Sequence, residues 1–165
     1  MEAFYLEKIN EVRKLKSELE KRLKIKIEIR GKQVCIDGDS LDEYDASLVF
    51  EAIQFGFSVK KSLTLKSEET IFKRIHVKSH TKRNLKDVVG RIIGLHGKTK
   101  KTLMEISGCY IVIKDGEVGI IGDVESANNV ETAILGLIRG SKQANMYRYL
   151  QRMNKKNENQ KIFNF

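Results

Sequence analysis

A pair of glycines between two helical patterns constrains the fold of this chain more than any other feature. Gly94 and Gly97 interrupt a stretch whose apolar spacing predicts one helix over residues 85–93 and a second over residues 98–106. Two glycines this close together allow a tight reversal and let the backbone approach another chain without Cβ clashes. Residues 110–114 then alternate as a strand does. The pattern therefore predicts a helix, a glycine turn, a helix and a strand in succession.

The glycine turn is followed at once by positive charge. Lys98, Lys100 and Lys101 lie in the first turn of the second helix, where backbone amides add a partial positive charge that favours phosphate. The whole stretch over residues 92–113 resembles the KH signature: two aliphatic residues, GxxG, a basic helix with spaced aliphatics, a small-glycine turn and an alternating strand. KH modules grip about four nucleotides in this way. The alternative is a plain helix-turn-helix connector with solvated lysines.

Bases of a bound strand would need an apolar surface beside the turn. We expect Val89 and Ile93 to form one wall of a groove and the strand near Ile111 to form the other. His96 is expected at the tip of the turn, where it can hydrogen-bond or stack on RNA. It has no Cys, Asp or second His at the spacing of a catalytic base or metal ligand.

The first half of the chain repeats part of this pattern. Residues 27–39 superpose on residues 111–123 without a gap, so that Gly38-Asp39 meets Gly122-Asp123 before the next helix in each half. This agreement predicts a duplicated α+β module. The counterpart of the glycine turn is residues 10–13, which contain no glycine. Apolar spacing over residues 6–23 predicts an uninterrupted helix in its place.

The predicted fold class is therefore α+β, with two tandem KH-type modules, each a three-stranded sheet packed by helices. The first module lacks GxxG. A degenerate module is expected over residues 1–68, the module with the GxxG loop over residues 69–140, and a basic C-terminal helix and tail over residues 141–165. In the last helix of the first module, Leu41, Tyr44, Leu48, Ala52 and Ile53 are expected on one side.

Charge and cysteine content narrow the function classes. The chain has 31 Lys and Arg against 22 Asp and Glu, a net charge of +9 that favours polyanions as partners.

Cys35 and Cys109 lie far apart in the sequence, each inside an apolar run, so we expect two core residues rather than a metal site or a disulfide. No signal-peptide pattern or membrane-length apolar stretch is present, so an intracellular protein is expected. No cofactor is expected.

Motifs along nearly the whole chain resemble one family of KH proteins. They are Phe55-Gly56-Phe57, the run over residues 89–94, Lys98-Thr99-Lys100, Ile120-Ile121-Gly122 and Tyr147. This combination resembles the partner-of-Nob (Dim-two) ribosome-assembly factors. The resemblance implies a non-catalytic RNA-binding protein that holds the 3′ region of small-subunit rRNA or its precursor. It also implies work beside the Nob-type 3′-end rRNA endonuclease and small-subunit ribosomal proteins, with no membrane partner.

The resemblance also implies which residues contact RNA: Arg91, Ile93, Gly94, Leu95, His96, Gly97, Lys98, Thr99, Lys100 and Lys101. The final helix, around residues 147–156, is implied to touch rRNA or a neighbouring protein. The implied location is the nucleus, nucleolus and cytoplasm if the source is eukaryotic, and the cytoplasm if it is archaeal.

Two other function classes remain open on the sequence alone. A KH regulator of mRNA or single-stranded DNA would keep the same loop and act outside ribosome assembly. A nucleic-acid enzyme would need acidic or His residues that converge on a metal ion. Asp115, Glu117 and Asp123 instead occupy positions typical of turns and helix caps.

Overall fold

The chain repeats one order of elements: a strand, two helices, a strand hairpin and a long helix. The computed structural model describes residues 1–163, and contacts within it divide the chain into two compact units between Thr70 and Ile71. The first run is β1 (Glu2–Tyr5), α1 (Ile9–Lys14), α2 (Lys16–Leu23), β2 (Lys26–Arg30), β3 (Gln33–Asp37), α3 (Ser40–Phe55), α4 (Val59–Leu63) and η1 (Thr64–Lys66). The second run is β4 (Thr70–His76), η2 (Val77–His80), α5 (Leu85–Ile93), η3 (Leu95–Gly97), α6 (Lys98–Ser107), β5 (Tyr110–Lys114), β6 (Glu117–Asp123), α7 (Val124–Ile138) and α8 (Gln143–Phe163).

Both units build the same three-stranded sheet. The strand order is β1-β3-β2 in the first unit and β4-β6-β5 in the second, so the second strand of each hairpin lies at the centre. The hairpins are antiparallel, with Ile27 opposite Ile36 and Ile111 opposite Ile120. The predicted α+β class, with three-stranded sheets packed by helices and a C-terminal helix, is confirmed.

The predicted three-stranded sheet of the first unit is completed by a strand whose position was not predicted, and one expectation for this unit was wrong. A strand, β1, precedes the first helix and pairs with β3, although only Phe4 of its residues is buried. The helix predicted as uninterrupted is broken at Leu15, whose φ of −102° and ψ of 12° separate α1 from α2. Val12 and Leu19 are buried on either side of the break. The apolar spacing continues across Leu15 because both helices pack on the same core.

The two units also share the way their second helix ends. Lys24 follows α2 with φ of 54°, and Gly108 follows α6 with φ of 71°, both in the left-handed region. These positions match in the superposition made from the sequence. Asp123 caps α7 as expected, because its Oδ1 accepts a hydrogen bond from the Ser126 amide at 2.7 Å. Asp39 precedes α3 without such a bond.

Helix α3 faces the core differently from the prediction, and α4 and η1 follow it within the first unit. Ala52 and Ile53 are buried, but Leu41 is 74% exposed and Tyr44 is 63% exposed. The core-facing side instead includes Phe50, which stacks on Phe4 with ring centroids 5.6 Å apart. The early apolar residues of α3 therefore point away from the core.

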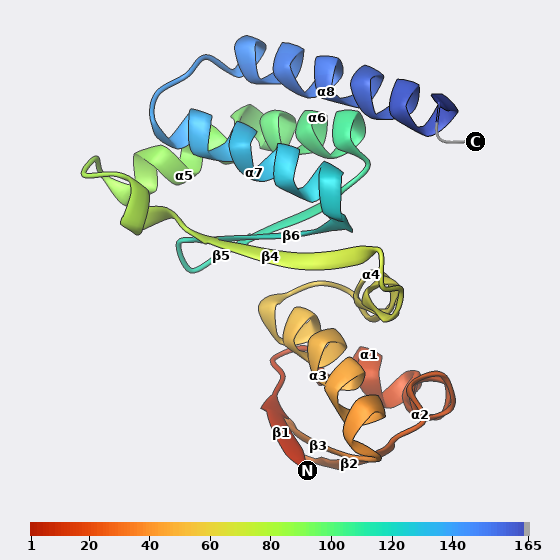
Figure 1. Ribbon diagram of the computed structural model, residues 1–165. Coiled ribbons are helices and arrows are strands. Elements are labelled where there is room, and N and C mark those ends of the chain that lie inside the picture. The colour runs from red at the N-terminus through yellow and green to blue at the C-terminus, as the bar shows by residue number, and fades with distance from the viewer. Residues whose placement is uncertain (164–165) are drawn as a thin grey trace. The chain divides into compact units, whose positions relative to one another are not determined.

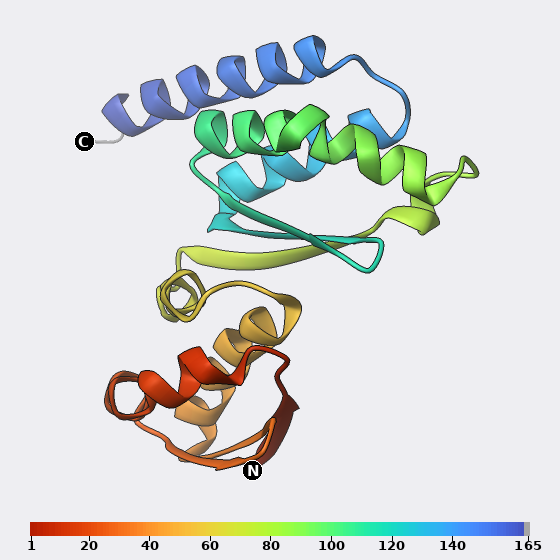
Figure 2. The ribbon, with the colours of Figure 1, turned by 180° about the vertical axis from the view of Figure 1, so that it is seen from behind.

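The second unit has three layers, which Figures 1 and 2 show from opposite sides. Helices α5, α6 and α7 cover one face of the sheet, and α8 lies on α6 and α7, away from the strands. Leu150 is the fully buried residue of α8, and the side-chain amide of Asn154 donates to the Ile106 carbonyl at the end of α6. Helix α8 thus extends the core of the second unit.

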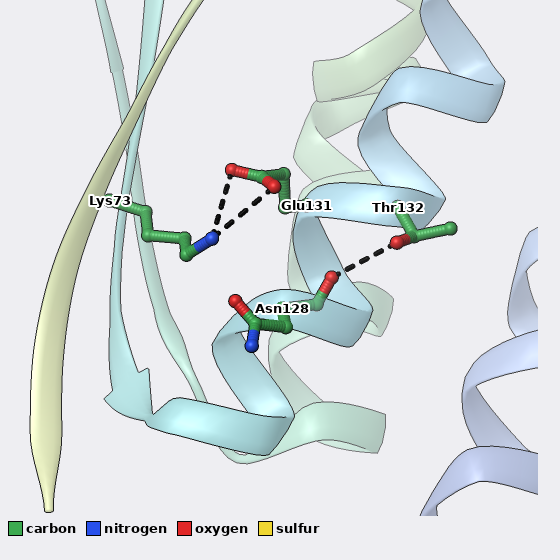
Figure 3. Close-up of polar contacts among 4 residues, drawn as sticks. All are labelled: Lys73, Asn128, Glu131 and Thr132. Atoms are coloured by element: carbon green, nitrogen blue, oxygen red, sulfur yellow. Dashed lines mark hydrogen bonds and ion pairs between the residues drawn. The ribbon is translucent and has the colours of Figure 1, made fainter.

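A polar contact joins the edge strand β4 to α7. The Lys73 ammonium lies 3.3 Å and 3.4 Å from the two carboxylate oxygens of Glu131 (Figure 3), and both side chains are only about a third exposed. One turn earlier, the Asn128 carbonyl accepts a hydrogen bond from the Thr132 hydroxyl at 3.1 Å. The ion pair holds the β4 edge close to the helix layer.

Among the described residues, none of the helices is long and apolar enough to cross a membrane.

Candidate nucleic-acid interface

The glycine turn between α5 and α6 requires glycine at its two ends for different reasons. Gly94 has φ of 77° and ψ of 173°, and a Cβ there would lie 2.1 Å from Thr99 Oγ1 and 2.6 Å from the Thr99 backbone nitrogen. Gly97 has φ of 74° but open space where a Cβ would stand. Gly94 therefore allows α6 to pack close to the end of α5, whereas Gly97 serves the left-handed turn.

Several amides of the turn are already engaged. The Gly94 amide donates to the Gly90 carbonyl at 2.8 Å, and the Gly97 amide donates to the Gly94 carbonyl at 3.1 Å. The Lys98 amide donates to the Leu95 carbonyl. A phosphate beside this turn would therefore meet the positive end of α6 and its lysine side chains rather than these three amides.

The tip of the turn projects into solvent. Leu95 is 79% exposed, and His96 is also exposed. His96 has φ of 52° and ψ of 30°, which is the left-handed conformation in a residue with a side chain. This conformation places the imidazole at the tip, where the sequence predicted it.

A groove of about 560 Å³ opens beside the turn, along α6 and β5. Apolar side chains on its walls are joined by two cations and one carboxylate. The lining residues are Ile93, Gly97, Lys100, Lys101, Met104, Glu105, Gly108, Cys109, Tyr110 and Ile113. The arrangement can hold flat apolar groups against the walls while anionic groups face the lysines.

The predicted walls of the groove were correct for Ile93 and for the strand near Ile111, and wrong for Val89. Ile111 itself is only 2% exposed within the core of the second unit. Ile113, on the same face of β5, and Tyr110 form the wall on that strand. Two-residue alternation identifies the face of a strand but not which residue lies at its rim.

Met104 and Tyr110 complete the apolar walls and were not predicted from the sequence. Met104 follows the lysines of α6 by one turn, and Tyr110 begins β5 directly after Cys109. The available signal was their position in the KH-like stretch, because both lie between the glycine turn and the alternating strand. An aromatic ring at this place offers a surface on which a base can stack.

Two of the residues implied to contact RNA, Arg91 and Thr99, also hold the fold together, and whether they contact RNA stays a prediction. The Arg91 guanidinium donates to the Leu137 carbonyl at 3.0 Å and to the Ser141 carbonyl at 2.8 Å, and so joins α5 to the turn after α7. Thr99 is only 5% exposed because it packs against Gly94. Lys98 and Lys101 are exposed, and Lys100 is half-buried at the groove. Their contact with RNA stays a prediction.

Cys109 is at the floor of the groove but is not a reactive thiol. Burial raises its pKa to about 11, although a hydrogen bond with Ser107 acts in the opposite direction. The thiol is therefore protonated near neutral pH. Within residues 1–163, no group of three or more His, Cys, Asp or Glu side chains comes together as a metal site would require.

Charge is distributed unequally between the two units. Residues 71–165 contain 18 Lys and Arg against 8 Asp and Glu, a net charge of +10, whereas residues 1–70 contain 13 against 14 and are close to neutral. The excess positive charge thus lies in the unit that holds the glycine turn and the groove. Such a field attracts polyanions to that unit.

Comparison with known proteins places this geometry in one family. The family model of the second KH domain of PNO1, described as a eukaryotic-type KH domain (KH-domain type I), matches residues 71–155. The pre-rRNA-processing protein PNO1 of Candida albicans is 29% identical over 141 residues, which cover 82% of this chain and 50% of that protein. The chain spans 42–66% of the lengths of curated relatives from Methanocaldococcus jannaschii, Oryzias latipes and Candida albicans.

Two solved structures extend the similarity to both units. Dim2p from Pyrococcus horikoshii OT3 is 32% identical with a TM-score of 0.79, covering 92% of this chain and 98% of that one. The a/eIF2alpha–aDim2p–rRNA complex from the same organism contains a chain 32% identical with a TM-score of 0.80, covering 94% of each. The order of elements, the glycine turn, the family model and these structures agree, and the chain belongs to the PNO1/Dim2 family of KH-domain proteins.

Proposed function

We propose that this chain binds the 3′ region of small-subunit rRNA, or of its precursor, and assists maturation of that end. The observation that carries the proposal is the groove of about 560 Å³ beside the glycine turn, on a unit of net charge +10. The family supports the choice of RNA. The Candida albicans relative is named a pre-rRNA-processing protein, and aDim2p has been crystallised with rRNA and a/eIF2alpha.

The proposed mechanism of binding follows from the groove. A single strand lies along it with about four nucleotides in contact. Its phosphates face Lys98, Lys100 and Lys101 at the start of α6, where the helix dipole adds to their charge. Its bases pack on apolar walls such as Ile93 and Tyr110. Leu95 and His96, at the exposed tip, contact the strand where it enters.

Charge reversal tests this assignment with a matched control. Lys98→Glu/Lys100→Glu removes cations beside the groove, and Lys14→Glu/Lys16→Glu makes the same change in α1 and α2 of the first unit. We expect the first variant to bind a single-stranded RNA of the mature 3′-end sequence much more weakly. Each phosphate contact it loses should lower the slope of log K against log salt by about 0.7. Equal losses in both variants would contradict the assignment.

The role in maturation is tested in cells. We propose that the protein works beside the Nob-type 3′-end endonuclease and small-subunit ribosomal proteins and is not itself catalytic. Crosslinks mapped in cells should therefore lie near the 3′ end of small-subunit rRNA, and the protein should sediment with precursor particles. Crosslinks confined to mRNA or single-stranded DNA, with no sedimentation with precursors, would instead favour a KH regulator outside ribosome assembly.

The non-enzymatic role needs its own assay. The purified chain, supplied with Mg²⁺ or Mn²⁺, should leave an RNA spanning the mature 3′ end intact and protect a few nucleotides of it from an added nuclease. Cleavage that co-purifies with the protein and disappears when a single Asp or Glu is replaced would show that the chain is an enzyme.

A further inference from the structure

The first unit has an exposed apolar stripe on α3 that its own fold does not use. Leu41 is 74% exposed and Tyr44 is 63% exposed, and Leu48 follows one turn later, half-buried. Spacings of three and four residues place these side chains on one face of the helix. Large apolar residues scattered singly on a surface are ordinary, but a stripe of neighbours marks a contact site.

This stripe borders a groove of about 500 Å³ between α3 and β1, which we call the α3 groove. Its lining side chains include carboxylates but no Lys, Arg or His. The lining residues are Met1, Glu2, Ser40, Glu43, Tyr44, Ser47, Leu48 and Glu51. Three carboxylates, those of Glu2, Glu43 and Glu51, line it. The α3 groove is thus suited to cationic groups.

The charge around the α3 groove is opposite to that of the second unit. Residues 33–59 contain six Asp and Glu and no Lys, Arg or His. A surface of this sign repels the phosphates of RNA, so the α3 groove and the groove beside the glycine turn favour different ligands. A cationic polypeptide with apolar side chains matches both the carboxylates and the stripe.

We propose that the α3 groove binds a basic segment of a partner protein. Large apolar side chains of that segment pack on Leu41, Tyr44 and Leu48, and its Lys or Arg side chains pair with Glu43 and Glu51. The apolar contacts supply most of the affinity, because burial of an aromatic side chain such as Tyr44 contributes more than a solvent-exposed ion pair. The charges select basic segments over acidic ones. This assigns protein recognition to the first unit, separately from the RNA binding proposed for the second.

A pair of double variants tests the proposal. Tyr44→Ser/Glu51→Lys alters the α3 groove. Tyr5→Ser/Glu68→Lys makes the same chemical changes outside it, at a tyrosine 60% exposed and an exposed glutamate. None of the four side chains is in the core, so both variants should fold. The probe is a fluorescent amphipathic peptide of Leu and Lys, with a twin in which Glu replaces Lys, measured by anisotropy on the full chain.

The parent should bind the Lys peptide at the α3 groove, whereas any binding of the Glu twin by the basic second unit should be the same in the parent and in both variants. The change in the α3 groove should weaken binding by about tenfold or more, as loss of an aromatic anchor does, while the control stays within about twofold. Both variants should keep the RNA affinity of the parent, so failure here is distinguishable from failure of the proposed RNA binding. No binding of the Lys peptide by the parent, equal losses in both variants, or an equal loss of Glu-peptide binding in the α3 groove variant would overturn the proposal.

Discussion

Replacing Gly94 with alanine should destabilise the second unit far more than the same change at Gly97. At Gly94 the backbone lies in a region that only glycine occupies comfortably, at a cost of about 1–3 kcal/mol for another residue. The new Cβ would also lie 2.1 Å from Thr99 Oγ1 and 2.6 Å from the Thr99 nitrogen. Thr99 is buried, so relief requires movement of α6, which adds about 1–3 kcal/mol. The total is about 4 kcal/mol.

At Gly97 only the backbone conformation opposes a side chain. Its φ is 74°, and nothing lies within 4 Å of the added Cβ. The left-handed conformation costs about 1–2 kcal/mol, partly offset by the lower entropy of the unfolded alanine chain, which leaves about 1 kcal/mol. Adding Thr99→Ala to the Gly94 variant should not restore stability, because the Thr99 nitrogen and Cβ remain within 2.6 Å of the new methyl group.

Urea unfolding followed by far-UV circular dichroism measures the difference. Data from the parent and both variants are fitted with a separate transition for each unit, because the two units need not unfold together. The Gly94 variant should lose about 4 kcal/mol and the Gly97 variant about 1 kcal/mol, in the transition of the second unit. Equal destabilisation, or a larger loss at Gly97, would refute the argument that close approach of α6 makes glycine necessary at position 94.

Three further predictions concern other parts of the second unit. Leu95→Asp/His96→Asp should abolish binding of a short single-stranded RNA, because the new carboxylates would face its phosphates. The circular dichroism spectrum should stay unchanged, because both side chains are exposed at the tip. RNA binding within twofold of the parent would argue against RNA contact at the glycine turn. The free energy of unfolding should fall as pH rises from about 9 to about 11, because the Cys109 thiol ionises earlier in the unfolded chain than in the folded one, where its pKa is about 11. Cys109→Ala should reduce that fall by about 2–3 kcal/mol. A pH profile of the variant identical to the parent's would contradict the raised pKa of Cys109. Arg91→Ala should lower the free energy of unfolding by about 2–3 kcal/mol, because two backbone carbonyls lose a charged donor. Hydrogen exchange at the turn after α7 should become faster. Unchanged exchange there would show that these two hydrogen bonds do not stabilise the turn.

The second unit could be predicted from the sequence because its signals are local. Its first helix and first hairpin strand have the predicted bounds, Leu85–Ile93 and Tyr110–Lys114. Glycine at positions 94 and 97 breaks the helical pattern, and Asp123 is followed three residues later by the amide it caps. Each of these features depends on residues close together in the chain, so periodicity and turn chemistry were sufficient.

Other features depend on contacts that no local pattern records. The break at Leu15 has no glycine or proline to mark it, since α1 and α2 share one core and keep one apolar spacing. Arg91 contacts carbonyls 46 and 50 residues further along the chain, so its structural role could not be separated from a role in RNA binding. Leu41 and Tyr44 fit a helical stripe whether it faces the core or solvent. Only the packing of the folded unit decides between these two.

The central claim is that the groove beside the glycine turn is the place where this chain holds single-stranded RNA. Ultraviolet crosslinking of the full chain to a short RNA of the mature small-subunit 3′-end sequence, with crosslinked peptides identified by mass spectrometry, tests it most directly. We predict crosslinks at the turn, residues 95–101, and at Tyr110 in the groove, with a sharp loss in the Lys98→Glu/Lys100→Glu variant. Crosslinks concentrated in residues 1–70, or spread evenly over the lysines of both units, would contradict the claim.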